Sequence, residues 1–174
     1  MIKNFFKIYL IFLTFFFTLP SYADLPRYLD FKFILNNSEA GKKAQSFLKN
    51  KLEKGVVSLK EKEKKIQEEE KKIISQKKII TSDEYKKKIN ELRSKVESLQ
   101  KERNNLLETV AKQRSKARNE LLKNLNPIIQ EYMQENKVRM VIDKKTLLSA
   151  DENLDITQEI IKRLDKKLKS IKLN

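Results

Sequence analysis

The chain has 174 residues and carries 39 lysines and arginines against 24 acidic residues, a net charge of +15 at pH 7. It contains no cysteine and no histidine, which excludes disulfides, thiolate metal sites and the usual nucleophile–base pairs of enzymes. Its two glycines are too few for a glycine-rich loop that holds a nucleotide phosphate. The composition therefore argues against an enzyme and predicts no catalytic residues, no cofactor and no metal.

The N-terminal segment has the pattern of an export signal. Lys3 and Lys7 precede an apolar run over residues 8–17, and small residues stand at positions 21 and 23. This order predicts a signal peptide over residues 1–23, cleaved after Ala23. The alternative is a retained membrane anchor, which needs about twenty apolar residues. The run is shorter and is followed by Pro20. Cleavage removes two lysines and leaves a strongly basic exported protein.

Two segments at opposite ends of the central helical region predict a pair of short strands. They are residues 28–35 and 137–143, and residues 146–149 could add a third strand. The first two segments alternate apolar with polar residues, which is typical of a strand with one buried face. The apolar positions, which we expect to form the body and its oligomer interface, are Leu29, Phe31, Phe33, Val138, Met140 and Ile142.

Residues 38–136 carry the periodicity of a coiled coil. Ser38 is a suitable N-cap for the first helix. Up to residue 80, apolar residues recur every seven positions, and from Tyr85 to Ile128 they recur at alternating intervals of three and four. The first line consists of Leu52, Leu59, Ile66, Ile73 and Ile80, and its companion seam positions are expected at Glu63, Glu70 and Lys77. Because these three companions are charged, the distal seam should be weak.

The central region is interrupted once, at residues 81–84. Thr81 and Glu84 have the spacing of a capping box, and Ile80 and Tyr85 occupy the positions of a hydrophobic staple. This predicts a helical hairpin with its tip at residues 80–85 and arms of roughly 60–65 Å. The alternative is a single rod with a polar patch. Further along, the Asn126-Pro127 step predicts a kink or a restart of the second helix.

The tip gathers candidate contact residues for a binding partner. Ile74 and Ile79 lie off the heptad line, so they could form an apolar patch or simply widen the seam. The cations around them could bind acidic groups or could only form a solvated face. The expected contacts are Ile74, Ile79, Lys77, Lys78, Lys86 and Lys87. Gly55, in the first arm, is either a flexible point or a tolerated surface glycine.

The C-terminal region predicts one more helix. Asp155 and Gln158 resemble a helix start, and the following apolar residues keep helical spacing. They are Ile156, Ile160, Ile161, Leu164, Leu168 and Ile171. We therefore expect an α+β protein, mostly α, with a body from residues 24–37 and 137–174. A body this small buries too little surface as a monomer and should self-associate.

Several segments in order resemble the Skp/OmpH family of periplasmic chaperones. They are YLDFKFILNNSEAGKKA over residues 28–44, VRMVID over 138–143 and LDIT over 154–157, with the basic hairpin between the first two. The resemblance implies a homotrimer with a small β-rich body and three helical arms. It further implies that the arms enclose unfolded outer-membrane proteins without ATP, in the periplasm.

Three other partners or roles follow from charge and shape. A nucleic-acid binder is disfavoured, because the chain is exported and its lysines are interspersed with glutamates instead of stacking aromatics. A coiled-coil spacer or adaptor of an envelope complex stays open as the alternative function. Contact of the basic tip with an anionic lipid or lipopolysaccharide surface also stays open.

Overall fold

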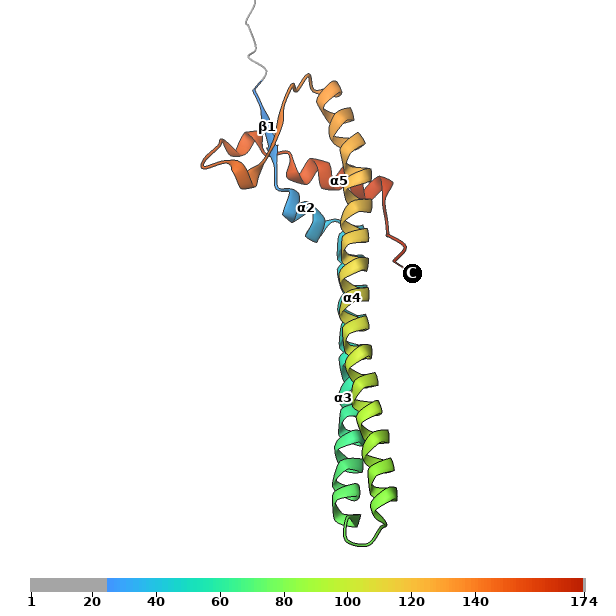
Figure 1. The fold of residues 1–174 in the computed structure, drawn as a ribbon. Coiled ribbons are helices and arrows are strands. Elements are labelled where there is room, and N and C mark those ends of the chain that lie inside the picture. Colours follow the sequence, from blue (N-terminus) through green and yellow to red (C-terminus); the bar gives the residue numbers. More distant parts are fainter. Residues whose placement is uncertain (1–24, 174) are drawn as a thin grey trace, which may run out of the picture.

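The computed structural model describes residues 25–173, and the predicted signal peptide lies outside these described residues. Its architecture is mostly α-helical, with a long helical hairpin projecting from a small body that contains a two-stranded sheet (Figure 1). None of the described helices is long and apolar enough to cross a membrane.

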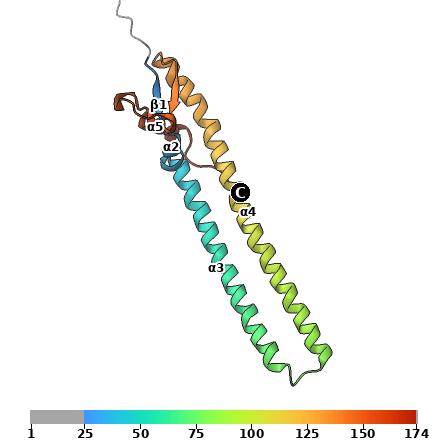
Figure 2. The ribbon, with the colours of Figure 1, turned by 60° about the vertical axis from the view of Figure 1, so that its left-hand side comes forward.

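The hairpin consists of α3 (Glu39–Gln76) and α4 (Ser82–Glu135), which run antiparallel side by side (Figure 2). The predicted hairpin is thus confirmed, and the single rod is excluded. Helix α4 is the longer of the two and continues beyond the start of α3 into the body.

Helix α4 runs without interruption through Pro127, so the predicted restart there is wrong. Proline removes one backbone hydrogen bond. Here it lies on the exposed face, where water can satisfy the freed carbonyl of Lys123. The neighbouring Leu125 and Ile128 are almost completely buried on the opposite face, and their packing holds the helix together.

Side chains cap both arm helices as their sequences predict. The Ser38 hydroxyl accepts a hydrogen bond of 3.2 Å from the Gly41 N–H at the start of α3. At the start of α4, the Thr81 hydroxyl accepts from the Glu84 N–H, and the Glu84 carboxylate accepts from the Thr81 N–H, both at 3.3 Å. This reciprocal capping box ends the turn and starts the return arm.

The predicted strand over residues 28–35 is wrong for most of its length. Strand β1 covers only Arg27–Leu29, and residues Phe31–Asn37 form helix α2. The Asp30 carboxylate accepts a 2.7 Å hydrogen bond from the Phe33 N–H and caps this helix. Helical spacing then places Phe31 and the fully buried Ile34 against the core. Tertiary packing and a cap override the β-propensity of the aromatic residues.

Strand β2 (Val141–Asp143) pairs with β1 in parallel, with Tyr28 opposite Ile142. The predicted partnership is confirmed, but Val138 and Met140 precede the strand. Lys137 adopts a φ of 55° at the end of α4, which delays the extended conformation. The third strand expected at residues 146–149 is also wrong. Asp143 instead accepts a hydrogen bond from the Lys145 N–H and starts a short 3-10 helix, η1 (Lys144–Thr146).

The C-terminal helix α5 spans Thr157–Lys167 and follows a second 3-10 turn, η2 (Glu152–Leu154). Asp155 accepts a hydrogen bond from the Thr157 N–H, but the N-cap of α5 is Ile156, one residue after the predicted start, and its side chain makes no capping hydrogen bond. Leu168 and Ile171 lie beyond the end of α5, although helical spacing placed them within it. Residues 168–173 continue back toward the hairpin (Figure 1).

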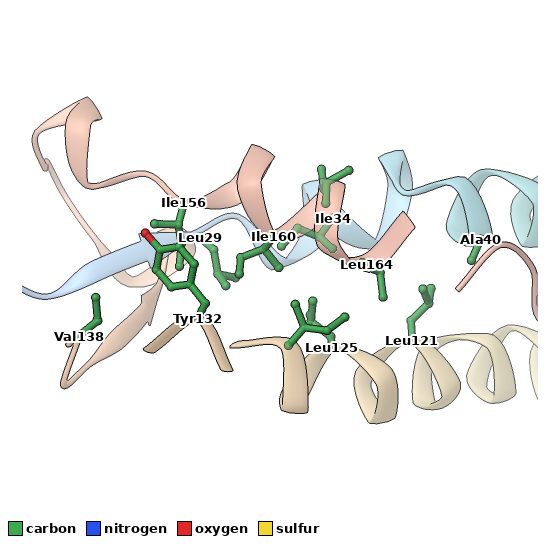
Figure 3. Close-up of a cluster of buried hydrophobic side chains, with 12 residues drawn as sticks. Leu29, Ile34, Ala40, Leu121, Leu125, Tyr132, Val138, Ile156, Ile160 and Leu164 are labelled. Atoms are coloured by element: carbon green, nitrogen blue, oxygen red, sulfur yellow. The ribbon is translucent and has the colours of Figure 1, made fainter. Parts of the chain in front are cut away.

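One apolar core joins the two ends of the chain (Figure 3). It packs α2 and α5 against the end of α4, with β1 at its edge. Its most deeply buried side chains are Ile34, Leu125, Ile128, Ile160 and Leu164. The body therefore depends on contacts between residues more than a hundred positions apart.

A charged pair ties the start of α3 to the C-terminal segment. The Glu39 carboxylate lies 2.8 Å from Lys169 Nζ and 2.8 Å from Lys43 Nζ. Hydrogen bonds from Lys169 and Lys43 lower the pKa of Glu39 from its usual 4.5 to about 2. A carboxylate with a depressed pKa stabilises the folded state above its unfolded pKa, and this contribution is lost as the pH falls through the folded pKa.

We expect the contribution of the Glu39–Lys169 ion pair to appear in the pH dependence of stability. Between pH 6 and about pH 4.5, wild type should have a higher Tm than a Glu39→Gln variant. The difference should shrink as the pH falls below about 4.5 and vanish only below pH 2, where the wild-type carboxyl is neutral as well. Thermal unfolding followed by circular dichroism at several pH values measures it. A constant difference down to pH 2 would contradict this assignment.

Candidate functional site

The two arms contact each other differently near the body and near the tip. Near the body, Ala44 and Leu48 of α3 pack with Val110 and Ala117 of α4 in a buried apolar cluster. Toward the tip, buried apolar residues become sparse; those described are Leu59, Ile73 and Leu92. The predicted weak distal seam is consistent with this thinning.

Polar pairs replace the missing apolar contacts in the distal half. Lys62 Nζ lies 2.5 Å from Glu102, Lys95 Nζ lies 2.6 Å from Glu69, and Lys88 Nζ donates to Gln76 at 2.9 Å. We call these three pairs the polar ladder. Exposed ion pairs contribute little each and are screened by salt. The distal arms are therefore held together more loosely than the proximal arms.

The polar ladder corrects the expected seam. Its α3 members, Lys62, Glu69 and Gln76, are seven residues apart and continue from Gly55. Glu70 and Lys77, which the sequence placed in the seam, are exposed. The second set of seam positions on α3 thus lies three residues after each apolar seam residue, and not four residues after it as expected from the sequence. Of the three charged companions, Glu63 reaches across to Arg103 at 3.6 Å, and the exposed Lys77 lies over the ring of Tyr85 at the tip.

Gly55 lies in the contact between the arms and is therefore not a surface glycine. A Cβ atom at this position would stand 2.4 Å from Leu106 Cδ2. The absence of a side chain lets Leu106 approach the α3 backbone closely at the point where the apolar seam gives way to the polar ladder.

Two grooves run between the arms on this weakly packed stretch. One, of about 250 Å³, is lined by Leu59, Leu106 and their apolar neighbours, with charged groups at its rim. The other, of about 350 Å³, has Ile66 and Leu99 as its apolar lining and lies beside the polar ladder. Grooves of this size can each accept one or two aliphatic side chains of a partner.

Apolar side chains also face solvent along the arms. Those on the shafts are Phe47, Val56, Val57, Val96 and Leu107. At the tip, Ile79 is 83% exposed and Ile74 is 58% exposed. Both isoleucines are mostly exposed, so neither is buried in the contact between the arms, and their contact with a partner stays a prediction. Single exposed apolar residues are common, but this series runs along α3 from Phe47 to the tip and includes Val96 and Leu107 in the middle of α4.

Exposed cations accompany these apolar residues at the tip. Lys77 lies over the Tyr85 ring, 5.8 Å from its centroid, and Lys86 is 3.9 Å from Asp83. Within residues 25–173, Lys78 and Lys87 have no ion-pair partner. The tip thus offers positive charge that is not neutralised within the chain. Groups of acidic side chains that could hold a metal ion are absent from the same described residues.

Of the six predicted interface residues of the body, Ile142 is half-buried and pairs with Tyr28 in the sheet, and the other five divide into two groups. Leu29 and Val138 are buried in the core of the single chain, and the partly buried Phe31 packs against this core. Phe33 and Met140 are exposed. The other large exposed apolar residues of the body are Leu25 and Leu148. These exposed side chains are available for contacts with other subunits.

Some features of the arms were not predicted from sequence. The polar ladder could have been found from the seven-residue spacing of Gly55, Lys62, Glu69 and Gln76, which parallels the apolar line. The contact of the C-terminal residues with the arms had only a faint signal, the apolar residues Ile171 and Leu173 beyond the last helix.

Comparisons with known proteins agree with this architecture. A family model described as outer membrane protein (OmpH-like) matches residues 27–164. A crystal structure of a candidate outer membrane chaperone (OmpH-like) from Caulobacter crescentus superposes with a TM-score of 0.79. The two chains share 22% sequence identity, and the match covers 85% of this chain and 89% of that chain. None of the curated proteins matches.

Proposed function

Because the chain belongs to the OmpH-like family, we propose that it is an ATP-independent holdase chaperone of the periplasm. Its arms bind unfolded outer-membrane proteins and prevent their aggregation before membrane insertion. The description of the solved relative as a candidate outer membrane chaperone supports this role and not that of an enzyme.

One observation carries this proposal, namely the combination of exposed apolar side chains and surplus positive charge along arms whose apolar contacts thin out toward the tip. An unfolded β-barrel precursor exposes alternating apolar residues and unpaired strand edges. Many weak contacts with Val57, Leu107 and Ile79 can cover such residues without fixing one conformation. A net positive charge attracts acidic segments over a longer range.

The proposed working form is a homotrimer with a cavity between the arms. A single body exposes the apolar side chains of Leu25, Phe33, Met140 and Leu148, which self-association could cover. The arms of three chains around one axis would then line a positive cavity. Mass measurement of the mature assembly, with and without an unfolded barrel protein, tests this stoichiometry. A folded monomer at micromolar concentration would contradict it.

The holdase activity is tested by diluting an urea-unfolded outer-membrane barrel into buffer. With stoichiometric amounts of this protein, the barrel should stay soluble, whereas a coiled-coil spacer would leave it to aggregate. Light scattering measures the outcome. Raising the salt concentration should weaken binding without abolishing it, because screening removes only the electrostatic part.

The tip residues are tested by two double variants in the same assay. Ile74→Ser with Ile79→Ser removes the apolar patch, and Lys78→Gln with Lys87→Gln removes the unpaired charge. Each should weaken client binding by several-fold, and only the lysine variant should show a weaker salt dependence than wild type. Lys32→Gln with Lys145→Gln, on the exposed surface of the body, is the matched control. Unchanged binding in both tip variants would remove the tip from the binding surface.

The same two lysines also suit an anionic lipid or lipopolysaccharide surface. If the tip binds such a surface, the wild-type protein co-sediments with vesicles of anionic lipid and not with zwitterionic ones. The Lys78→Gln, Lys87→Gln variant should then lose this association.

A further inference from the structure

The last described residues form a strap along the hairpin. We use this name for residues 168–173, which leave α5 and return to the base of the arms (Figure 1). Leu173 is 3% exposed and packs in the cluster that joins the two arms near the body. Ile171 packs against this arm cluster and also against the body core. The strap therefore connects two apolar cores that are otherwise separate.

Polar contacts hold the strap at both ends. At its start, Lys169 Nζ lies 2.8 Å from the Glu39 carboxylate at the beginning of α3. At its end, the Gln113 side-chain amide of α4 donates to the Leu173 carbonyl oxygen. Just before the strap, the Asp165 carboxylate of α5 accepts a 2.7 Å hydrogen bond from the Glu39 N–H. Both arms are thus tied to the C-terminal segment.

We propose that the strap clamps the base of the hairpin to the body and confines arm bending to the part beyond Leu48 and Val110. Apart from the strap, α4 continues without a break into the body core, whereas α3 is joined to the body along the chain through α2, with Ser38 alone between the two helices. Beyond the clamp, the apolar seam thins and the polar ladder begins. The functional consequence, a limit on how far the cavity opens, rests on the proposed holdase function.

Simple geometry gives the size of the effect. At 1.5 Å per residue, α3 extends about 56 Å from Glu39 to Gln76 but only about 42 Å from Leu48 to Gln76. Releasing the strap moves the pivot from the second point to the first. For the same bending angle, the sideways displacement of the tip then grows about 1.3-fold.

Distance measurements between two spin labels test this directly. The chain has no cysteine, so Lys32→Cys on α2 and Lys78→Cys at the tip give a single labelled pair. Labelled chains are diluted with unlabelled ones, so that distances within one chain dominate. The Leu173→Ser variant should broaden the body-to-tip distance distribution by at least about 1.3-fold. Lys172→Ser, an exposed neighbour in the same strap, should leave it unchanged.

Two further measurements distinguish release of the strap from unfolding of the body. Thermal unfolding shows whether Leu173→Ser leaves the body folded, and if it does not, Gln113→Ala releases the end of the strap instead. An unchanged distribution in a folded variant overturns the proposal. These distances are measured without a client, so their failure is independent of holdase activity. If they broaden as expected, faster client release from the same variant links the strap to retention.

Discussion

Replacing Gly41 with alanine is expected to lower the free energy of unfolding of the body by roughly 2–4 kcal/mol. A Cβ atom at this position would lie 2.0 Å from the backbone carbonyl oxygen of Leu35 and 2.9 Å from the Ser38 hydroxyl. Neither oxygen atom can move away without a cost in free energy. The carbonyl belongs to the last turn of α2, and the hydroxyl caps α3 through the Gly41 N–H. The variant must separate the two helices, lose the cap, or both.

Gly55→Ala is the matched control, because it makes the same change in the same helix. Its new methyl group would meet Leu106 side-chain atoms, which can rotate away. Alanine also gains about 1 kcal/mol of helix propensity over glycine, so the net change should be small. Urea unfolding of both variants at one protein concentration measures the difference, since oligomerisation makes stability depend on concentration. Equal losses in the two variants would contradict the assigned role of Gly41.

Gly41 also governs where the arm points. It lies in the first turn of α3, and its close contact with Leu35 sets the angle between α2, which packs in the body, and the arm. A Gly41→Ala variant that still folds should therefore orient its arm differently. The geometry of any cavity between subunits depends on this angle.

The features that were predicted correctly depend on local sequence. The capping box of Thr81 and Glu84 needs only residues three positions apart, and it specified the turn of the hairpin. Ser38 likewise marks the start of α3. Heptad spacing identified the apolar half of the seam, because helical periodicity decides which residues share a face.

The incorrect predictions concern segments whose conformation depends on distant partners. Residues 31–37 have aromatic and branched residues typical of a strand, yet Asp30 caps a helix there and Ile34 packs under α5. The Asp30 N–H is held by the Thr157 hydroxyl at 2.8 Å, from 127 positions away. Such a contact has no signal within a local window, so alternation alone could not distinguish helix from strand.

The candidate site was foreseen in part for the same reason. The exposure of Ile74 and Ile79 follows from their positions off the heptad line. The polar ladder instead requires knowing which α4 residue stands opposite each α3 residue, and that register depends on the length of the turn. The strap requires knowing where the chain goes after α5 ends, which no periodicity describes.

Truncating Leu164 to alanine should destabilise the body by about 2–5 kcal/mol. Leu164 is completely buried on α5, within the core that includes Ile34 of α2 and Leu125 of α4. Its removal leaves a cavity that the surrounding helices cannot fill without moving. Because α5 ends in the strap, the loss should loosen the strap as well as the core.

The same truncation at Leu107 provides the control, since this leucine is 54% exposed on the arm. Its loss should change stability by less than about 0.5 kcal/mol. In Leu164→Ala, near-ultraviolet signals from Tyr28 and Tyr132 should be lost at lower urea than the helical signal, which comes mostly from the arms. Coincident loss of both signals would mean that the arms cannot stay helical without the body. Separate loss would show that the body organises arms whose helical structure is largely their own, as a holdase with movable arms requires.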